Sequence, residues 1–299
     1  RRAFLWNDQR CAGQCQDVLR DLGGFEKLRC YTNNNMLPGY QGGKILWLRE
    51  EEPDNYAKMA KAVLPKDYLR YKLTGEYYTD VSDASGTGLF DVKNRRYSQE
   101  LLDKLKLPRD LFPPVVESDE ITGEITEEAA ELTGLLPGTF VAGGGGDSVI
   151  QTTGMGLIKE GILGLTLGTG GIVAMGMSQY LENHDETLQF FCNNARGLYH
   201  VMGVMLACGG SYQWYRNTLC MDEMEKAKRL KKDPYDLLNQ GASESGPGAK
   251  GLIYLPYLTG ERTPHMNPCA KGMFAGLTLR HDRRHMVRAV MEGVTMSLR

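Results

Sequence analysis

The chain lacks the features that mark several classes of protein. It has no run of 18 apolar residues, so we expect no transmembrane helix. It has no excess of positive charge, because 35 basic residues stand against 37 acidic ones, and this argues against general nucleic-acid binding. Its seven cysteines are odd in number, and Cys11 and Cys15 have no second pair or histidine nearby to complete a zinc site. We therefore expect reduced thiols in a cytoplasmic protein.

Glycine is abundant instead, at 36 of 299 residues, and it clusters at 143–146, 168–171, 209–210 and 246–251. Glycines next to apolar runs are typical of a backbone that turns tightly or approaches a ligand closely. None of these clusters is a Gly-x-Gly-x-x-Gly motif that opens a helix after the first strand, which excludes a Rossmann dehydrogenase. The cluster at 168–171 has no Gly-Lys-Ser/Thr continuation, which excludes a Walker loop.

The apolar patterns predict alternating strands and helices, and hence an α/β fold with a sheet in each half of the chain. A length of 299 residues suits about two domains, and we place them at 1–158 and 159–299, with a seam near 155–161. The predicted strands are 3–6, 139–142, 162–167, 172–175, 200–207 and 252–255. The predicted helices are 54–63, 66–72, one capped by Ser98 through 107, one capped by Thr126 over 127–132, one that carries Gln213 and Trp214, 221–236 and 286–298, with a loop at 242–250.

Asp147 is the first candidate for catalysis, because it follows an apolar strand and four glycines. A carboxylate at a strand end on bare backbone is well placed to face a cleft and to accept a proton from a hydroxyl. The same pattern also fits an aspartate that caps the following helix, which begins Ser148-Val149. The two interpretations are compatible, and the local pattern does not decide between them.

Two glycine segments are candidate phosphate sites. Gly168–Gly171 lies between two apolar strands, where consecutive glycine amides can surround an anion and Thr169 adds a hydroxyl. Gly209 and Gly210 follow a strand and precede a helix, which is a position favourable to phosphate. Local pattern alone favours a plain hairpin turn for the first segment, and a packing glycine explains the second at least as well.

Two polar segments complete the set of candidates. Trp6–Arg10 places a ring, a carboxylate and a guanidinium within five residues, which suits recognition of a polyol; surface charges at a strand end are the alternative. Gly260–His265 follows a strand and is rich in polar groups, and its adjacent Glu261 and Arg262 suit a structural ion pair. We interpret His265 as structural rather than catalytic.

Together these segments resemble the FGGY family of carbohydrate kinases, and within it the xylulokinases. The similar stretches are Trp6–Arg10, 64–76, 82–92, Gly144–Asp147, 167–171 and Tyr257–Leu277, in the family's order and over essentially the whole chain. Gly170 departs from the family, since many relatives have serine there. The resemblance implies a two-lobed, actin-like or ribonuclease-H-like α/β fold, with the sugar in the first lobe and the nucleotide phosphates in the second.

The resemblance also implies roles for single residues. Asp147 would be the general base, and Trp6, Asp8 and Ser148 would contact the sugar. Gly168, Thr169 and Gly170 would face the phosphates of ATP, and Gly209, Gln213 and Trp214 would match nucleotide-contact positions. Asp147 is in addition a candidate ligand of Mg²⁺ through water.

The implied reaction is the ATP-dependent phosphorylation of D-xylulose to D-xylulose 5-phosphate. The alternatives are a ribulokinase, gluconokinase or glycerol kinase, or a sugar-binding relative without turnover. The family's first phosphate loop, its Met-His-Gly sugar contact and its adenosine segment are absent from this sequence. We therefore expect a central fragment of a longer kinase, whose partners are a sugar and ATP and not a nucleic acid or a membrane, with a homodimer as a further candidate state.

Overall fold

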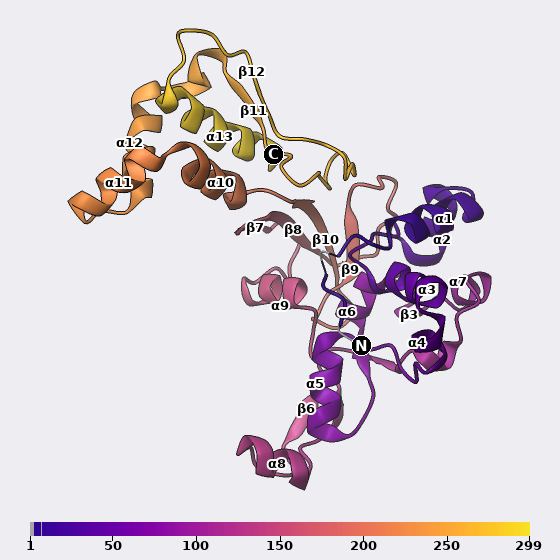
Figure 1. Cartoon of the computed structure of the whole chain (residues 1–299). Coiled ribbons are helices and arrows are strands. Elements are labelled where there is room, and N and C mark those ends of the chain that lie inside the picture. Colours follow the sequence, from indigo (N-terminus) through magenta and orange to yellow (C-terminus); the bar gives the residue numbers. More distant parts are fainter. Residues whose placement is uncertain (1–2, 7) are drawn as a thin grey trace. The chain divides into compact units, whose positions relative to one another are not determined.

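The computed structural model of the chain describes residues 3–6 and 8–299 (Figure 1). The described residues form two compact units. Unit 1 comprises the described residues of 1–163 together with 174–201, and unit 2 comprises 164–173 and 202–299. Both units are therefore assembled from separate stretches of sequence. Among the described residues, no helix is long and apolar enough to cross a bilayer.

Unit 1 opens with helices α1 (Ala12–Leu22), α2 (Phe25–Thr32) and α3 (Gln41–Glu51). Helix α1 ends at Gly23, which adopts the left-handed conformation that glycine accepts without strain. Helices α1 and α3 pack closely at Gly43, where a Cβ atom would lie 2.5 Å from the Sγ atom of Cys15. The predicted strand at 3–6 is wrong, because Phe4 instead packs edge-on against Trp47 of α3, with ring centroids 5.6 Å apart.

The middle of unit 1 consists of short elements around one apolar core that includes Leu28, Phe90, Leu101 and Phe112. Strand β1 pairs in parallel with β4, and the pairs β2–β3 and β5–β6 are antiparallel. The elements are α4 (Pro53–Ala57), α5 (Pro65–Thr74), β1 (Thr79–Asp80), α6 (Val81–Ala84), the 3₁₀ helix Ser85–Thr87, β2 (Phe90–Asp91), β3 (Arg96–Tyr97), α7 (Gln99–Lys104), the 3₁₀ helix Arg109–Leu111, β4 (Val115–Val116), β5 (Ile121–Glu124), α8 (Glu127–Thr133), β6 (Phe140–Ala142) and α9 (Asp147–Gly154).

The predicted caps of two of these helices are confirmed. The Ser98 hydroxyl accepts from the amide of Leu101 at the start of α7, and the Thr126 hydroxyl does the same for Ala129 in α8. The predicted helix 54–63 is wrong beyond Ala57. The amide of Ala62 donates to the carbonyl of Leu111 at 2.7 Å, and the proline at 65 forces the residue before it into an extended conformation.

Four further strands form one sheet in the order β7-β8-β10-β9. They are β7 (Leu163–Leu167), β8 (Gly171–Met177), β9 (Gln189–Cys192) and β10 (Tyr199–Met205). The neighbouring strands β7 and β8 are joined by residues 168–170, so the predicted hairpin with a glycine-rich turn is confirmed.

The rest of unit 2 surrounds a second apolar core that includes Tyr215, Leu238, Tyr254 and Val290. Its elements are α10 (Gly209–Leu219), α11 (Met221–Leu230), α12 (Pro234–Ser245), the 3₁₀ helix Pro247–Gly251, β11 (Ile253–Leu255), β12 (Met273–Ala275) and α13 (Arg283–Ser297), with β11 antiparallel to β12.

The single helix predicted over 221–236 is in fact two helices. Lys231 adopts a left-handed conformation that ends α11, and the Asp233 carboxylate accepts from the amide of Tyr235 to cap α12. Helix α12 then continues to Ser245, so the first part of the predicted loop at 242–250 is helical as well.

Candidate active site

The loop that precedes Asp147 runs from the end of β6 to the start of α9. At two of its glycines a side chain would collide with neighbouring protein atoms. A Cβ atom on Gly143 would lie 2.8 Å from the carbonyl oxygen of Glu117, and one on Gly145 would lie 1.9 Å from the Nδ2 atom of Asn194. Such contacts are closer than carbon can approach these atoms. The glycines predicted to allow a close approach therefore do so, although the group that approaches is part of the protein itself.

Three other segments of unit 1 hold this loop by hydrogen bonds to its backbone. The Nη1 atom of Arg70 donates to the carbonyl of Gly143 at 2.9 Å. The amide of Gly144 donates to the carbonyl of Ser118 at 3.1 Å. The amide of Gly146 donates to the Oγ atom of Ser82 at 3.0 Å. The backbone on the N-terminal side of Asp147 is thus fixed at Gly143, Gly144 and Gly146.

Asp147 is the first residue of α9, and its side chain is exposed. The N-cap position belongs to Gly146, so the interpretation of Asp147 as the helix cap is wrong. Its Oδ1 atom accepts from the amide of the half-buried Ser148 at 2.8 Å. Since the N-terminal end of a helix favours negative charge, this position suits a carboxylate side chain that remains accessible to a ligand.

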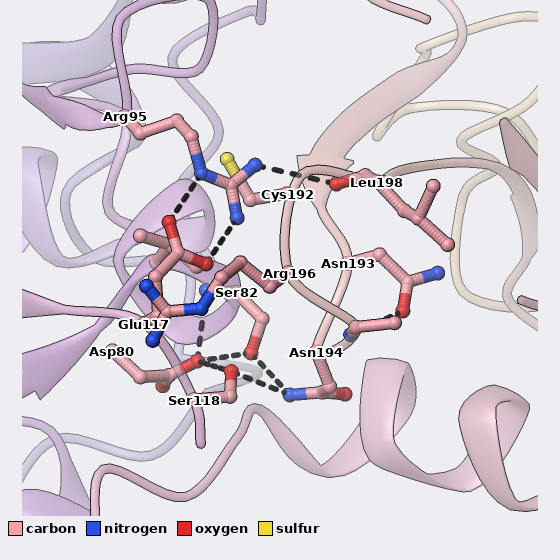
Figure 2. A network of polar contacts seen from close by, with 12 residues as sticks. Asp80, Ser82, Arg95, Glu117, Ser118, Cys192, Asn193, Asn194, Arg196 and Leu198 are labelled. Atoms are coloured by element: carbon pink, nitrogen blue, oxygen red, sulfur yellow. Dashed lines mark hydrogen bonds and ion pairs between the residues drawn. The ribbon is translucent and has the colours of Figure 1, made fainter. Parts of the chain in front are cut away.

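Asp80 is the centre of a buried polar network behind the loop, and Figure 2 shows its side chain together with those of Ser82, Ser118 and Asn194. The Oδ2 atom of Asp80 accepts from the hydroxyl of Ser118 at 2.8 Å and from the hydroxyl of Ser82. The Nδ2 atom of Asn194 donates to the Oγ atoms of Ser82 at 2.9 Å and Ser118 at 3.1 Å. The network thus joins segments up to 112 residues apart in sequence.

Charged side chains of neighbouring residues surround Asp80. The Lys66 ammonium lies 2.9 Å from the Oδ1 atom of Asp80 and 3.6 Å from the Oδ2 atom of Asp83, and it also pairs with Asp67. Burial disfavours the charged form of Lys66, but the attraction of these carboxylates outweighs it, so its pKa lies above the ordinary value. Burial raises the pKa of Asp83 to about 7, and the negative charge of Asp147 adds to that rise.

The segment Trp6–Arg10, which is predicted to bind the sugar, lies in unit 1, and an ion pair holds two of its side chains together. Arg10 donates to Asp8, with Nη2 and Oδ2 2.8 Å apart, and hydrogen bonding from Arg10 holds the pKa of Asp8 below its usual range. The guanidinium lies over the ring of Trp47, 5.0 Å from its centroid. Trp6 is 68% exposed, so its ring is available to a ligand. Asn7 of the same segment lies outside the described residues.

The glycine turn between β7 and β8 packs against the start of α10 in unit 2. The amide of Gly209 donates to the carbonyl of Gly168 at 2.9 Å, and the amide of Gly210 donates to that of Thr169 at 3.0 Å. A Cβ atom on Gly209 would lie 2.6 Å from the Gly168 oxygen, so glycine is required there too. The first amides of α10 therefore hold the turn.

This packing sets the direction of the amides in the turn. In a trans peptide the N–H points opposite to the C=O of the same peptide unit. Because the carbonyls of Gly168 and Thr169 point at α10, the amides of Thr169 and Gly170 point away from it. The Thr169 side chain is exposed beside them. This arrangement offers donors of the kind that bind an anion.

The two other residues predicted to contact the nucleotide lie on α10 itself. Gln213 is exposed, whereas Trp214 is half-buried and stacks on Tyr254, with ring centroids 6.5 Å apart and an interplanar angle of 14°. The structure thus groups Gly168, Thr169, Gly170 and Gly209 through direct hydrogen bonds and places Gln213 and Trp214 on the adjoining helix. Trp6, Asp8, Asp147 and Ser148 belong to the other unit.

Glu261 has a structural role that its sequence context indicated only in part. It is 2% exposed, and its Oε1 atom accepts from the amides of Leu206 and Arg262, each at 2.8 Å. Burial raises its pKa, and these two hydrogen bonds oppose the rise. His265 is exposed, and its Nε2 atom lies 2.9 Å from the hydroxyl of Tyr257; its interpretation as structural stays a prediction. Glu261 therefore fixes the backbone just after β10 rather than forming the predicted side-chain ion pair.

The sequence analysis missed Ser82, Ser118 and Asn194, which lie in the polar network beside the loop that precedes Asp147. Ser82 stands in the segment Asp80–Ala84, whose dense short polar side chains are the signal that could have identified it. Asn194 and Ser118 have no such local signal, because they reach the loop only through the fold.

Comparisons with known proteins agree on one family. Residues 1–154 match the N-terminal domain of the FGGY family of carbohydrate kinases, and residues 163–299 match its C-terminal domain. The chain is 38% identical over 297 residues to a xylulose kinase of Lactococcus lactis, and 33% identical over 296 residues to a gluconokinase of Bacillus subtilis. Each alignment covers 99% of this chain and 57% of the relative, so the chain spans little more than half the length of these proteins.

A solved structure gives the same result for the fold. The crystal structure of a xyloylose kinase from Brucella ovis superposes with a TM-score of 0.84 at 34% identity, over 98% of this chain and 57% of the other. The expected two-lobed α/β kinase fold is therefore confirmed.

Proposed function

The chain belongs to the FGGY family of carbohydrate kinases, and on that premise we propose that its protein transfers the γ-phosphoryl group of ATP to D-xylulose, giving D-xylulose 5-phosphate and ADP. The observation that carries the proposal is the exposed carboxylate of Asp147, fixed at the start of α9 by a loop whose backbone is bonded to three other segments. The relatives named xylulose kinase support the choice of sugar.

Asp147 acts as the general base in this proposal. Its carboxylate takes the proton of the substrate hydroxyl as the hydroxyl oxygen forms a bond to the γ-phosphorus, while the bond from that phosphorus to the β,γ-bridging oxygen breaks and ADP leaves. Phosphoryl transfer depends mainly on positioning and on stabilisation of charge, so a base on a rigid loop suits the reaction. Trp6, Asp8 and Ser148 bind and orient the sugar.

The phosphates of ATP are assigned to unit 2. The amides of Thr169 and Gly170 and the Thr169 hydroxyl donate to the phosphate oxygens. Gly209, which has no Cβ atom, lets the start of α10 approach the carbonyl of Gly168. Gln213 and Trp214 on α10 line the nucleotide-binding site in this proposal. What supports this assignment is the direction of the amides in the turn, which the bonds to α10 impose.

A divalent cation fits the carboxylate of Asp147. Magnesium is usually held by one or two carboxylates together with waters and phosphate oxygens. Asp147 is exposed and would hold the ion through water. When bound, Mg²⁺ neutralises charge on the transferred phosphoryl group. A cytoplasmic location and a homodimer stay predictions within this proposal.

The test of the base is Asp147→Asn in the complete protein. The amide keeps the size of the side chain and cannot accept the proton, so we expect kcat to fall at least ~100-fold with the KM for xylulose within ~3-fold. Turnover within a few-fold of the parent would remove Asp147 from this role. The non-catalytic alternative predicts no turnover in the parent protein either.

The test of the substrate compares kcat/KM for D-xylulose, ribulose, gluconate and glycerol under the same conditions. We expect D-xylulose to be preferred. If it were poorer than another substrate by about 100-fold, equivalent to about 2.7 kcal/mol of transition-state binding, the protein would be a different member of the family. Gluconate is the main competitor, because a gluconokinase is among the similar proteins.

A further inference from the structure

The position of Asp147 depends on the backbone of the residue before it. Asp147 begins α9, so the orientation of the peptide that joins it to Gly146 decides where the carboxylate points. Gly146 is buried, and its amide donates to the Oγ atom of Ser82 at 3.0 Å. Among the hydrogen bonds described above for this loop, this one is closest in sequence to Asp147.

Ser82 is fully buried, and its hydroxyl has every hydrogen-bonding position engaged. A serine hydroxyl offers one proton and two acceptor positions. The proton goes to the Oδ2 atom of Asp80, and the acceptor positions take the amide of Gly146 and, at 2.9 Å, the Nδ2 atom of Asn194. Figure 2 shows the contacts of Ser82 with Asp80 and Asn194. Because a carboxylate accepts and does not donate, Asp80 takes the proton of the hydroxyl and leaves its lone pairs for Asn194 and the amide of Gly146.

Asp80 is itself fixed in orientation. It is fully buried, its Oδ1 atom lies 2.9 Å from the Lys66 ammonium, and its Oδ2 atom also accepts from the amide of Ser82 at 2.8 Å. A buried charge is retained at low cost only when it is paired and hydrogen-bonded, and here it is both. The direction of the Ser82 hydroxyl is therefore imposed by an ion pair.

We propose that Ser82, oriented by Asp80, is a positioning residue for the catalytic base: its hydroxyl holds the Gly146 amide and thereby aims the carboxylate of Asp147 at the substrate hydroxyl. The inference rests on the proposed function, in which Asp147 is the base. Small displacements of a catalytic group can reduce turnover by up to ~100-fold, so the hydroxyl is expected to act on kcat more than on sugar binding.

Ser118 provides a matched control within the same network. Its hydroxyl also donates to the Oδ2 atom of Asp80, at 2.8 Å, and also accepts from the Nδ2 atom of Asn194, at 3.1 Å. It differs from Ser82 in its contact to the loop: that contact comes from the backbone carbonyl of Ser118, which receives the amide of Gly144 and survives truncation of the side chain. The two serine-to-alanine variants thus differ in the bond to Gly146.

The experiment measures kcat, the KM for the sugar and thermal unfolding for Ser82→Ala, Ser118→Ala and Asp147→Asn in the complete protein. We expect Ser82→Ala to lower kcat at least ~10-fold with KM within ~3-fold, and Ser118→Ala to lower kcat by no more than ~3-fold. We also expect Ser82→Ala to have no further effect on residual turnover when Asp147 is already asparagine, because the two residues act in series.

Each outcome is decisive. Equal losses in the two serine variants, or a loss from Ser82→Ala that persists unchanged beside Asp147→Asn, would overturn the role of Ser82 and leave the proposed function intact. Full turnover in Asp147→Asn would remove Asp147 from the role of general base and overturn this inference with it, whereas absence of turnover in the parent protein would overturn the proposed function. If Ser82→Ala does not fold, Ser82→Cys fills the site with a somewhat larger thiol that is only a weak acceptor, and it is expected to lose at least ~5-fold in kcat; parental kcat in that variant would overturn the role of Ser82.

Discussion

Gly209→Ala tests whether the turn at 168–170 binds the nucleotide. The added Cβ atom would lie 2.6 Å from the carbonyl oxygen of Gly168 and 3.4 Å from its carbon. Both are backbone atoms, so no flexible side chain can move aside. Gly209 lies in the ordinary helical region, and alanine is acceptable there in every other respect. The strain is therefore relieved only by moving the turn away from α10.

The expected increase in the KM for ATP follows from the free-energy cost of overpacking. Forcing one additional carbon into a packed site typically costs about 1–3 kcal/mol. If that cost falls on the arrangement that binds phosphate, the KM for ATP rises by about 5-fold to 150-fold. The KM for the sugar is expected to stay within ~2-fold, because the residues assigned to the sugar belong to unit 1.

The assay is steady-state kinetics with each substrate varied in turn, together with thermal unfolding. Gly241→Ala in α12 is the matched control, since it adds the same atom to a helix of the same unit, at an ordinary 3.4 Å from the flexible side chain of Arg284. It should leave both KM values unchanged. A folded Gly209→Ala protein with an unchanged KM for ATP would refute the assignment of the turn to phosphate.

Three further predictions concern the loop, the charges and a helix cap. Gly145→Ala would place Cβ 1.9 Å from the Nδ2 atom of Asn194 and should lower kcat at least ~10-fold, whereas Gly154→Ala, with nothing within 4 Å, should leave it unchanged; equal kcat values in the two would refute the packing argument. Burial raises the pKa of Asp83 to about 7, so the folded state binds the proton of the Asp83 carboxyl more tightly than the unfolded state does. Protonated Asp83 therefore contributes stability at low pH, and this contribution is lost as the pH rises through about 7. Denaturant unfolding at pH 5 and pH 8 should show that loss in the parent and a smaller one in Asp83→Asn. Asp282 caps α13, and its Oδ1 atom accepts from the amides of Arg284 and His285, so Asp282→Ala should lower the free energy of unfolding by about 1 kcal/mol and Asp282→Asn by less, as measured by the same unfolding experiments.

The parts of the site that the sequence predicted are those with a local signal. Asp147 after four glycines, the glycine turn between two apolar strands, and Gly209–Gly210 at a strand-to-helix junction are each patterns within a few residues, and the structure has all three elements. The caps at Ser98 and Thr126 were predictable for the same reason, because a cap acts on amides two or three positions away.

The parts that were missed depend on contacts distant in sequence. The hydrogen bond from Asn194 to Ser82 spans 112 residues, and only the fold brings the two together. The break between α11 and α12 had a local signal, the Asp233-Pro234 pair, but the charged residues on both sides favour one continuous solvent-facing helix. The helix predicted beyond Ala57 failed because a tertiary bond from Ala62 to Leu111 outweighed the helical pattern.

The two glycine segments share a physical requirement that explains why the missed residues matter. A glycine segment has no side chains to fix its own conformation, so its shape must be imposed by its neighbours. In unit 1 a buried carboxylate, Asp80, orients Ser82, which holds Gly146. In unit 2 another buried carboxylate, Glu261, accepts from the amide of Leu206 just after β10. The carbonyl of Met205, the residue before Leu206, lies against the glycine turn, because a Cβ atom on Gly170 would be 2.8 Å from its oxygen. Neither carboxylate is proposed to touch the substrate. Each acts through the backbone on a segment that is proposed to bind it. Substitutions of Asp80 or Glu261 should therefore change turnover or nucleotide affinity even in proteins that remain folded.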